Sequence, residues 1–83
     1  MRHAREAALD ELEPLLTRLR DVPGLTERTR GVFYKKSKAF LHFHEDPTGL
    51  YADVRLTADF ERFRAQTPAE QESLLVKVVA AID

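Results

Sequence analysis

Two histidines one residue apart, His42 and His44, give this 83-residue sequence its clearest potential for chemistry. In an extended strand, residues i and i+2 point to the same side, so both imidazoles would project from one face. Histidine pairs bind transition metals, and one carboxylate would complete a ligand set of the type that holds zinc or non-haem iron. The sequence offers three carboxylates for this role: Asp53, Glu45 and Asp46. The alternative is that both histidines are surface residues that hydrogen-bond to Tyr51 and Asp53, while His3 lies in a frayed terminus.

The same alternation separates the two sides of the strands expected at residues 39–44 and 50–56. One side collects apolar residues: Ala39, Leu41, Phe43, Leu50, Ala52, Val54 and Leu56. The opposite side collects the candidate binding residues: Phe40, His42, His44, Tyr51, Asp53 and Arg55. Helices are expected to cover the apolar side, which leaves the mixed side open as the working surface. A tight preceding turn would add Phe33 and Lys35 to the open side.

Two registers between these strands keep both apolar sides together. In the first, His44 lies opposite Tyr51. His42 then lies opposite Asp53, and we expect that carboxylate to raise the pKa of the imidazole. In the second register, shifted by two residues, His42 lies opposite Tyr51 instead.

Three lysines close to aromatic residues, Lys35, Lys36 and Lys38, suggest a stacking platform for single-stranded nucleic acid. Thirteen basic residues against fourteen acidic ones give a net charge of −1, which disfavours binding to a polyanion or an anionic membrane. The lysines would otherwise be ordinary turn residues. An exposed face or a free edge strand also suits a protein partner, a second copy of the chain or a small ligand.

Several classes of function lack the residues that they need. The chain has no cysteine, which removes disulfides and thiolate chemistry, and its three glycines cannot form a glycine-rich phosphate loop. No G-x-S-x-G motif is present. The first residues are charged with no apolar segment behind them, and the longest aliphatic run, residues 78–82, is too short to span a membrane. A cytoplasmic binding protein is therefore expected rather than an enzyme.

The element that precedes the strands is a helix. Leucines recur with helical spacing over residues 3–20. Pro14 lies inside this pattern, so we expect one helix with a kink at that residue. Pro23 and Gly24 then end it, because proline cannot continue the hydrogen-bond ladder and glycine tolerates a left-handed turn.

Three period-two segments predict an antiparallel meander, at residues 32–34, 39–44 and 50–56. Residues 25–30 are polar and are interpreted as a loop or a short turn, and residues 57–66 form either a short helix or an edge strand. Thr67-Pro68-Ala69-Glu70 has the pattern of a helix start, with threonine as N-cap. The sequence thus predicts one two-layer α+β domain over residues 1–83, in the order helix, three-stranded meander, helix.

Several features follow one another in a distinctive order: Pro23-Gly24, Glu27, Val32-Phe33, Lys38-Ala39-Phe40-Leu41, residues 50–56, Phe60 and Phe63. This order, which covers roughly residues 9–65, resembles that of the small MmcQ/YjbR-type α/β proteins. The resemblance implies a DNA-binding protein of the double-wing type. The histidine-asparagine-lysine and tryptophan region of that family has no counterpart here, so its DNA-binding role is assigned to no residue of this chain. The chain equally resembles an uncharacterised bacterial family of small helix–meander–helix proteins.

Overall fold

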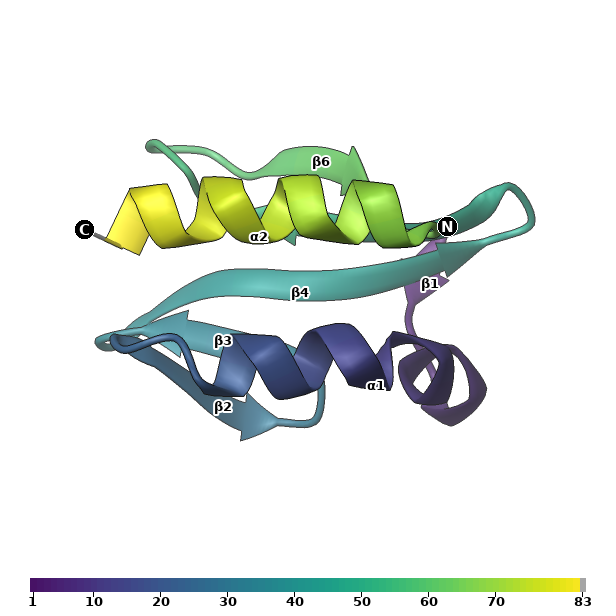
Figure 1. The fold of residues 1–83 in the computed structure, drawn as a ribbon, viewed down its shortest axis with the longest axis horizontal. Coiled ribbons are helices and arrows are strands. Elements are labelled where there is room, and N and C mark those ends of the chain that lie inside the picture. The colour runs from purple at the N-terminus through teal and green to yellow at the C-terminus, as the bar shows by residue number, and fades with distance from the viewer. Residues whose placement is uncertain (83) are drawn as a thin grey trace.

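In the computed structural model, which describes residues 1–82, the leucine-rich N-terminal segment forms helix α1 (Glu6–Arg20). The leucines of its apolar stripe are buried. Pro14 lies inside the helix, and Figure 1 shows the first turns of α1 at an angle to the rest, as the predicted kink requires. The helix begins later than expected because Arg2–His3 forms a short strand, β1. After the helix, Gly24 takes the expected left-handed conformation, with a φ of +96°.

Helix α2 (Pro68–Ile82) starts at the capping pattern that the sequence predicts. The backbone N–H of Glu70 donates to Thr67 Oγ1 at 3.2 Å, and the backbone N–H of Thr67 donates to the Glu70 carboxylate at 3.0 Å. Each side chain therefore satisfies a backbone donor that the helix itself leaves free. Leu74 and Val78 are buried on the side of α2 that contacts the core.

The sheet is a meander of five consecutive strands, and β1 pairs with the long central strand. The five strands are β2 (Leu25–Thr29), β3 (Val32–Lys35), β4 (Lys38–Asp46), β5 (Gly49–Val54) and β6 (Glu61–Arg64). Neighbouring strands pair antiparallel throughout the described residues. Figure 1 shows both helices on the same side of the sheet. The predicted class, a two-layer α+β fold of helix, meander and helix, is confirmed.

Two segments extend the meander beyond the three predicted strands. Residues 25–30 are not a loop, because most of them form the edge strand β2. An edge strand with an exposed side needs few apolar residues, which explains its polar sequence. On that side the Arg28 guanidinium lies 4.2 Å from the centre of the Tyr34 ring. Residues 57–66 contain β6, so the edge strand is correct and the short helix is not.

The regular alternation of side chains between the two sides of the sheet is interrupted at the start of β4. Phe33 pairs with Leu41, and the next pair joins Tyr34 to Ala39. Phe40 is therefore an extra residue on β4, as in a β-bulge. Both phenylalanines are buried in the core, Phe33 at 0% and Phe40 at 3% exposure, and not on the open side where alternation predicted them.

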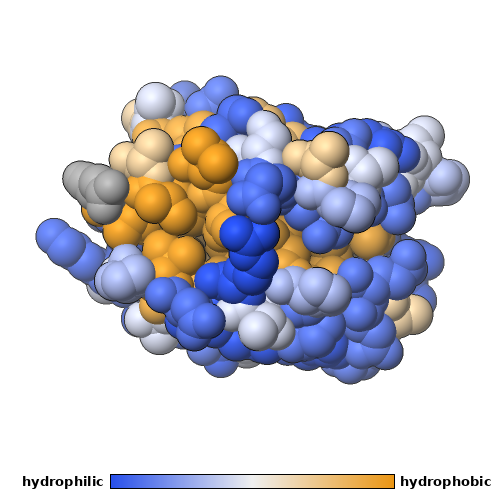
Figure 2. Space-filling view, viewed as in Figure 1, coloured by the Kyte–Doolittle hydropathy of each residue, from blue (hydrophilic) through white to orange (hydrophobic). Residues whose placement is uncertain are grey.

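The core lies between the two helices and the sheet. Residues from both helices and from the central strands build it: Leu12, Leu16, Leu19, Phe33, Phe40, Leu41, Phe43, Ala52, Val54, Leu74 and Val78. Figure 2, viewed from the helix side, shows apolar surface interrupted by a hydrophilic band, and an ion pair of 2.7 Å between Arg18 and Glu72 joins the two helices. Neither helix has the length and apolar character needed to cross a membrane in the part of the chain that the structure describes.

Candidate metal centre

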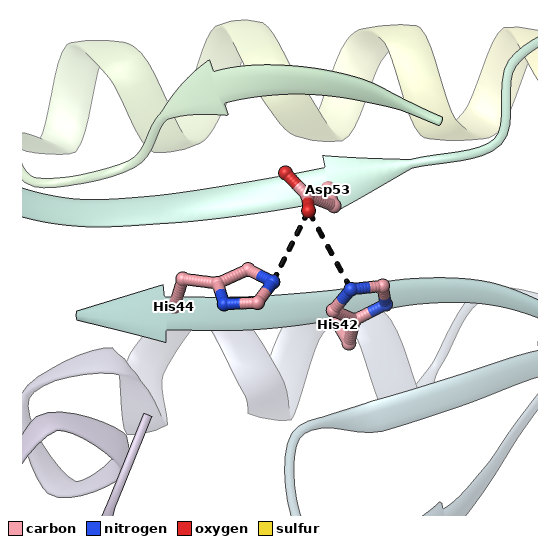
Figure 3. Close-up of side chains that lie close together, drawn as sticks. All are labelled: His42, His44 and Asp53. Carbon is pink, nitrogen blue, oxygen red and sulfur yellow. Dashed lines mark ion pairs between the residues drawn. The ribbon is translucent and has the colours of Figure 1, made fainter. Parts of the chain in front are cut away.

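The side of the sheet opposite the helices carries His42, His44 and Asp53. Alternation along β4 points both imidazoles to this side. In the observed register His44 lies opposite Tyr51, and Asp53 of β5 lies opposite His42, which is the first of the two predicted registers. Figure 3 shows the three side chains pointing toward one another from the two strands. Of the three candidate carboxylates, Asp53 is the one that lies beside both histidines.

Two of the distances between the three donor atoms suit a shared metal ion. Oδ2 of Asp53 lies 3.5 Å from Nε2 of His42 and 3.1 Å from Nε2 of His44 (Figure 3). Zinc bonds of about 2.0–2.1 Å in a tetrahedron place neighbouring donor atoms about 3.3 Å apart. The two observed distances lie on either side of this value. One ligand atom from each of the three residues lies within 4.8 Å of the others.

Asp53 is held in place from β6. Arg62, directly opposite it in the sheet, donates from Nε to Oδ1 at 2.7 Å and from Nη2 to Oδ2 at 2.9 Å. These hydrogen bonds are the main cause that lowers the pKa of Asp53 below its ordinary value, so the side chain is a carboxylate at neutral pH. Asp53 is also only 9% exposed, deeper than a residue on a bare surface.

His42 has the protonation state that a metal ligand needs. Burial lowers its pKa from the ordinary value of 6.5, and the neighbouring His44 lowers it further. Asp53 acts in the expected direction and raises this pKa, but burial and the second imidazole outweigh it, so the net shift is downward. Neutral imidazole offers a lone pair to a metal, so His42 is ready to bind one at pH 7.

The imidazole of His44 has two buried nitrogens without a hydrogen bond. Its Nε2 is close to Asp53, but the contact does not have hydrogen-bond geometry, and Nδ1 also has no partner within the described residues. A buried polar atom without a partner costs about 1–3 kcal/mol. Such an atom in a native structure needs an explanation, and a bound ion is one of the few available.

His3 and Phe60 border the histidine pair, and sequence reasoning placed neither of them there. His3 is not frayed, because β1 pairs it with His44, and the two rings stack with centroids 4.9 Å apart. Phe60 packs edge-on against His42 at 5.1 Å. No local pattern could have found β1, since it forms only because β4 extends beyond the end of β3 and leaves an edge to pair.

The other two candidate carboxylates are engaged elsewhere. Glu45 accepts hydrogen bonds from Nε of Arg2 at 3.2 Å and from the backbone N–H of Arg5 at 2.7 Å. Asp46 accepts hydrogen bonds from Thr48 in the turn between β4 and β5. Both contacts stabilise the local backbone, so Asp53 is left as the third donor.

Tyr51 and Arg55, predicted on the open side, are both half-buried there. Tyr51 lies beside His44 in the register, and its hydroxyl is 2.8 Å from that of Thr48. Arg55 lies at the opposite end of β5, where its guanidinium stacks 4.5 Å from the centre of the Phe60 ring. The predicted surface is thus divided, with the histidines at one end and Arg55 at the other.

The predicted stacking platform for nucleic acid is not assembled. Phe33 and Phe40 are buried and cannot stack on a base. Lys35 extends toward the helix side, where its Nζ donates to the carbonyl of Ala81 at 3.1 Å. It therefore does not join the open side as the expected tight turn would require.

Arg62 is the main member of the centre that the sequence analysis missed. Its position two residues before Arg64 in a segment that could be an edge strand was the available signal. Pairing across β5 makes it the immediate neighbour of Asp53, but this requires the register of β6, which the sequence does not specify.

No family model, curated protein or solved structure matches this chain. The resemblance to the MmcQ/YjbR-type proteins therefore stays a prediction. What bears on function is the geometry of the chain itself.

Proposed function

We propose that this protein is a small binding module for a divalent transition-metal ion, which His42, His44 and Asp53 hold on the open side of the sheet. The observation that carries the proposal is the convergence of two Nε2 atoms on one carboxylate oxygen, at two N–O separations that suit a tetrahedral ion. Burial of His44 with unpartnered ring nitrogens supports it further.

The donor set favours zinc, with iron as the second choice. Imidazole nitrogens suit zinc, iron, copper and nickel, whereas magnesium and calcium take oxygen ligands. Two histidines and one carboxylate also form the set known from non-haem iron sites. Three protein ligands leave at least one coordination position for water, a small ligand or a further side chain.

Arg62 is compatible with a nearby cation because of where it binds Asp53. Oδ1 accepts one of its two hydrogen bonds, and Oδ2 accepts the other while lying close to both imidazoles. A carboxylate oxygen has two lone pairs, so Oδ2 can bind a metal and Arg62 together. The guanidinium then acts from the outer shell and fixes the orientation of the carboxylate.

Zinc titration of protein produced without a histidine tag tests the proposal. We expect calorimetry to give one zinc ion per chain, and we expect thermal unfolding to shift upward, because an ion that binds the folded state stabilises it by about 2.7 kcal/mol at a concentration of 100 Kd. His42→Ala and His44→Ala should each abolish both effects. Asp59→Asn changes an exposed aspartate and is the control that should bind like wild type. Failure of wild type to bind zinc or iron, or unchanged binding in both histidine variants, would refute the metal site.

A further inference from the structure

A basic pocket opens at the end of the sheet remote from β1. It has a volume of about 360 Å³ and lies where the turn between β3 and β4 meets the end of β5 and the last turn of α2. Figure 1 shows the C-terminal end of α2 and the turn between β3 and β4 at the same end of the molecule, with β1 at the other. Its polar lining consists of four cations and two hydroxyls: Lys35, Lys36, Lys38, Arg55, Ser37 and Thr57.

The positive charge of this pocket has no counterpart within the described chain. No acidic residue among residues 1–82 lines the pocket, and none of its four cations forms an ion pair there. Elsewhere several arginines pair with carboxylates, among them Arg18, Arg20 and Arg30. Among residues 1–82, a nearly neutral composition therefore conceals a local excess of positive charge in the lining of this pocket.

Arg55 is fixed in place before any ligand arrives. Its Nε donates to the carbonyl of Ala39 at 3.0 Å, and Nη1 donates to the carbonyl of Ala58 at 3.2 Å. The ring of Phe60 supports the guanidinium from one side. A guanidinium held by two carbonyls and a ring loses little conformational freedom when it binds an anion.

Lys36 is the first residue of the two-residue turn between β3 and β4, Lys38 is the first residue of β4, and both are exposed. Lys36 has a φ of +59°, a left-handed conformation that suits glycine or asparagine better than lysine. The shape of the turn therefore does not account for a lysine at this position. The two ammonium groups remain free to reach an anion in the pocket.

The floor of the pocket is apolar. Phe40, Leu56 and Ala81 line it beneath the charged rim. Phe40 is buried and Leu56 packs against the core, so this floor is rigid. A ligand that fits both parts has an anionic group for the rim and an apolar body for the floor.

We infer that this pocket binds a small organic phosphate, a phosphate monoester with an aromatic or aliphatic body. The phosphate lies between Lys36, Lys38 and Arg55, and the body rests on Leu56 and Ala81. The volume suits one small molecule and not a run of nucleotides, since sites for small ligands begin at about 300 Å³. This site uses none of the side chains of the proposed metal centre, so the two proposals can be tested independently.

Titration with phenyl phosphate at low salt, in the presence of a chelator, tests the pocket without any metal. We expect saturable binding by calorimetry, tighter than that of inorganic phosphate because only the ester uses the apolar floor. Lys38→Gln and Lys36→Gly should each weaken binding by about threefold to tenfold, the range for a charge-assisted contact that solvent partly screens. Lys77→Gln removes the same charge from an exposed position of α2 that does not line the pocket and should leave the affinity unchanged.

Four results of the phosphate titrations would overturn the assignment. These are absence of saturable binding in wild type, an equal effect of Lys77→Gln, equal affinity for inorganic and phenyl phosphate, and unchanged affinity in both pocket variants. Mixed-sequence single-stranded DNA provides the remaining comparison. If it binds more tightly than phenyl phosphate, with an affinity that falls steeply with salt, the site belongs to nucleic acid and the small-molecule assignment is wrong.

Discussion

The two ends of strand β4 differ in whether their charged side chains have partners of opposite charge. At the histidine end, two half-buried imidazoles surround one carboxylate, and an arginine from β6 balances that carboxylate. At the lysine end, Lys36 and Lys38 are exposed, and no carboxylate of the described chain faces them. Imidazole donors around a carboxylate suit a cation, whereas uncompensated ammonium groups suit an anion.

This difference shows why net charge was a poor guide to binding. A total of −1 disfavoured anionic partners for the whole molecule, yet it averages over a balanced end and an unbalanced one. Phe60 is the structural link between them, because its ring contacts His42 on one side and the Arg55 guanidinium on the other. Substitutions that affect one end and spare the other therefore test whether the two sites are separate.

The largest effect should follow from Asp53→Asn at the histidine end. The substitution removes the one charged ligand and leaves Arg62 without its carboxylate, so we expect zinc affinity to fall by more than about 100-fold, beyond the usual cost of losing an outer-shell partner. We also expect a lower unfolding temperature without metal. Calorimetry with zinc measures the first effect and circular dichroism the second. Phenyl phosphate should bind as before, and a parallel loss of both ligands would show that the two ends are one site.

Much of the fold could be predicted because local patterns and tertiary structure agree. The capping sequence around Thr67, the kink at Pro14 and the alternation from Leu41 onward each specify their element without help from distant residues. Strand β2 could not be predicted in the same way. Its polar residues form a strand only because β3 supplies hydrogen-bond partners, and that information is absent from the segment itself.

The residues of the predicted open surface were placed correctly where side chains alternate regularly between the two sides of the sheet. They were misplaced where this alternation is interrupted. His42, His44 and Asp53 were found because β4 and β5 are regular in this region. Phe40 was misplaced because one extra residue shifts every side chain before it to the other side, and no glycine marks the bulge. His3 depends on a pairing across 40 residues of chain, for which no local signal exists.

A smaller effect is expected from Lys36→Gly at the lysine end. Glycine relieves a left-handed conformation that costs about 1–2 kcal/mol, and it adds about 0.5–1 kcal/mol of entropy to the unfolded chain. The free energy of unfolding should therefore rise by about 0.5–1 kcal/mol while phenyl phosphate binding weakens. Urea denaturation measures the change in stability. Zinc affinity should stay at the wild-type value. A loss of stability would mean that the lysine serves the turn and not a ligand.

The smallest effect concerns a third group of charges, the ion pairs of Glu13 with Arg20 and Arg30, which should respond only to acid. Hydrogen bonds from Arg20 and then Arg30 lower the pKa of Glu13 from 4.5 to about 2. A carboxyl group with a lowered folded-state pKa stabilises the fold above pH 4.5, and this contribution is lost as the pH falls toward 2. Glu13→Gln should therefore have a slightly lower unfolding temperature than wild type at pH 6, and the difference should shrink to nothing near pH 2. Lys38→Gln should show no such pH-dependent difference, because Lys38 has no carboxylate partner in the described chain. If Lys38→Gln instead gave the same acid-sensitive loss, the lysine end would be paired in solution, and the contrast between the two ends of β4 would no longer hold.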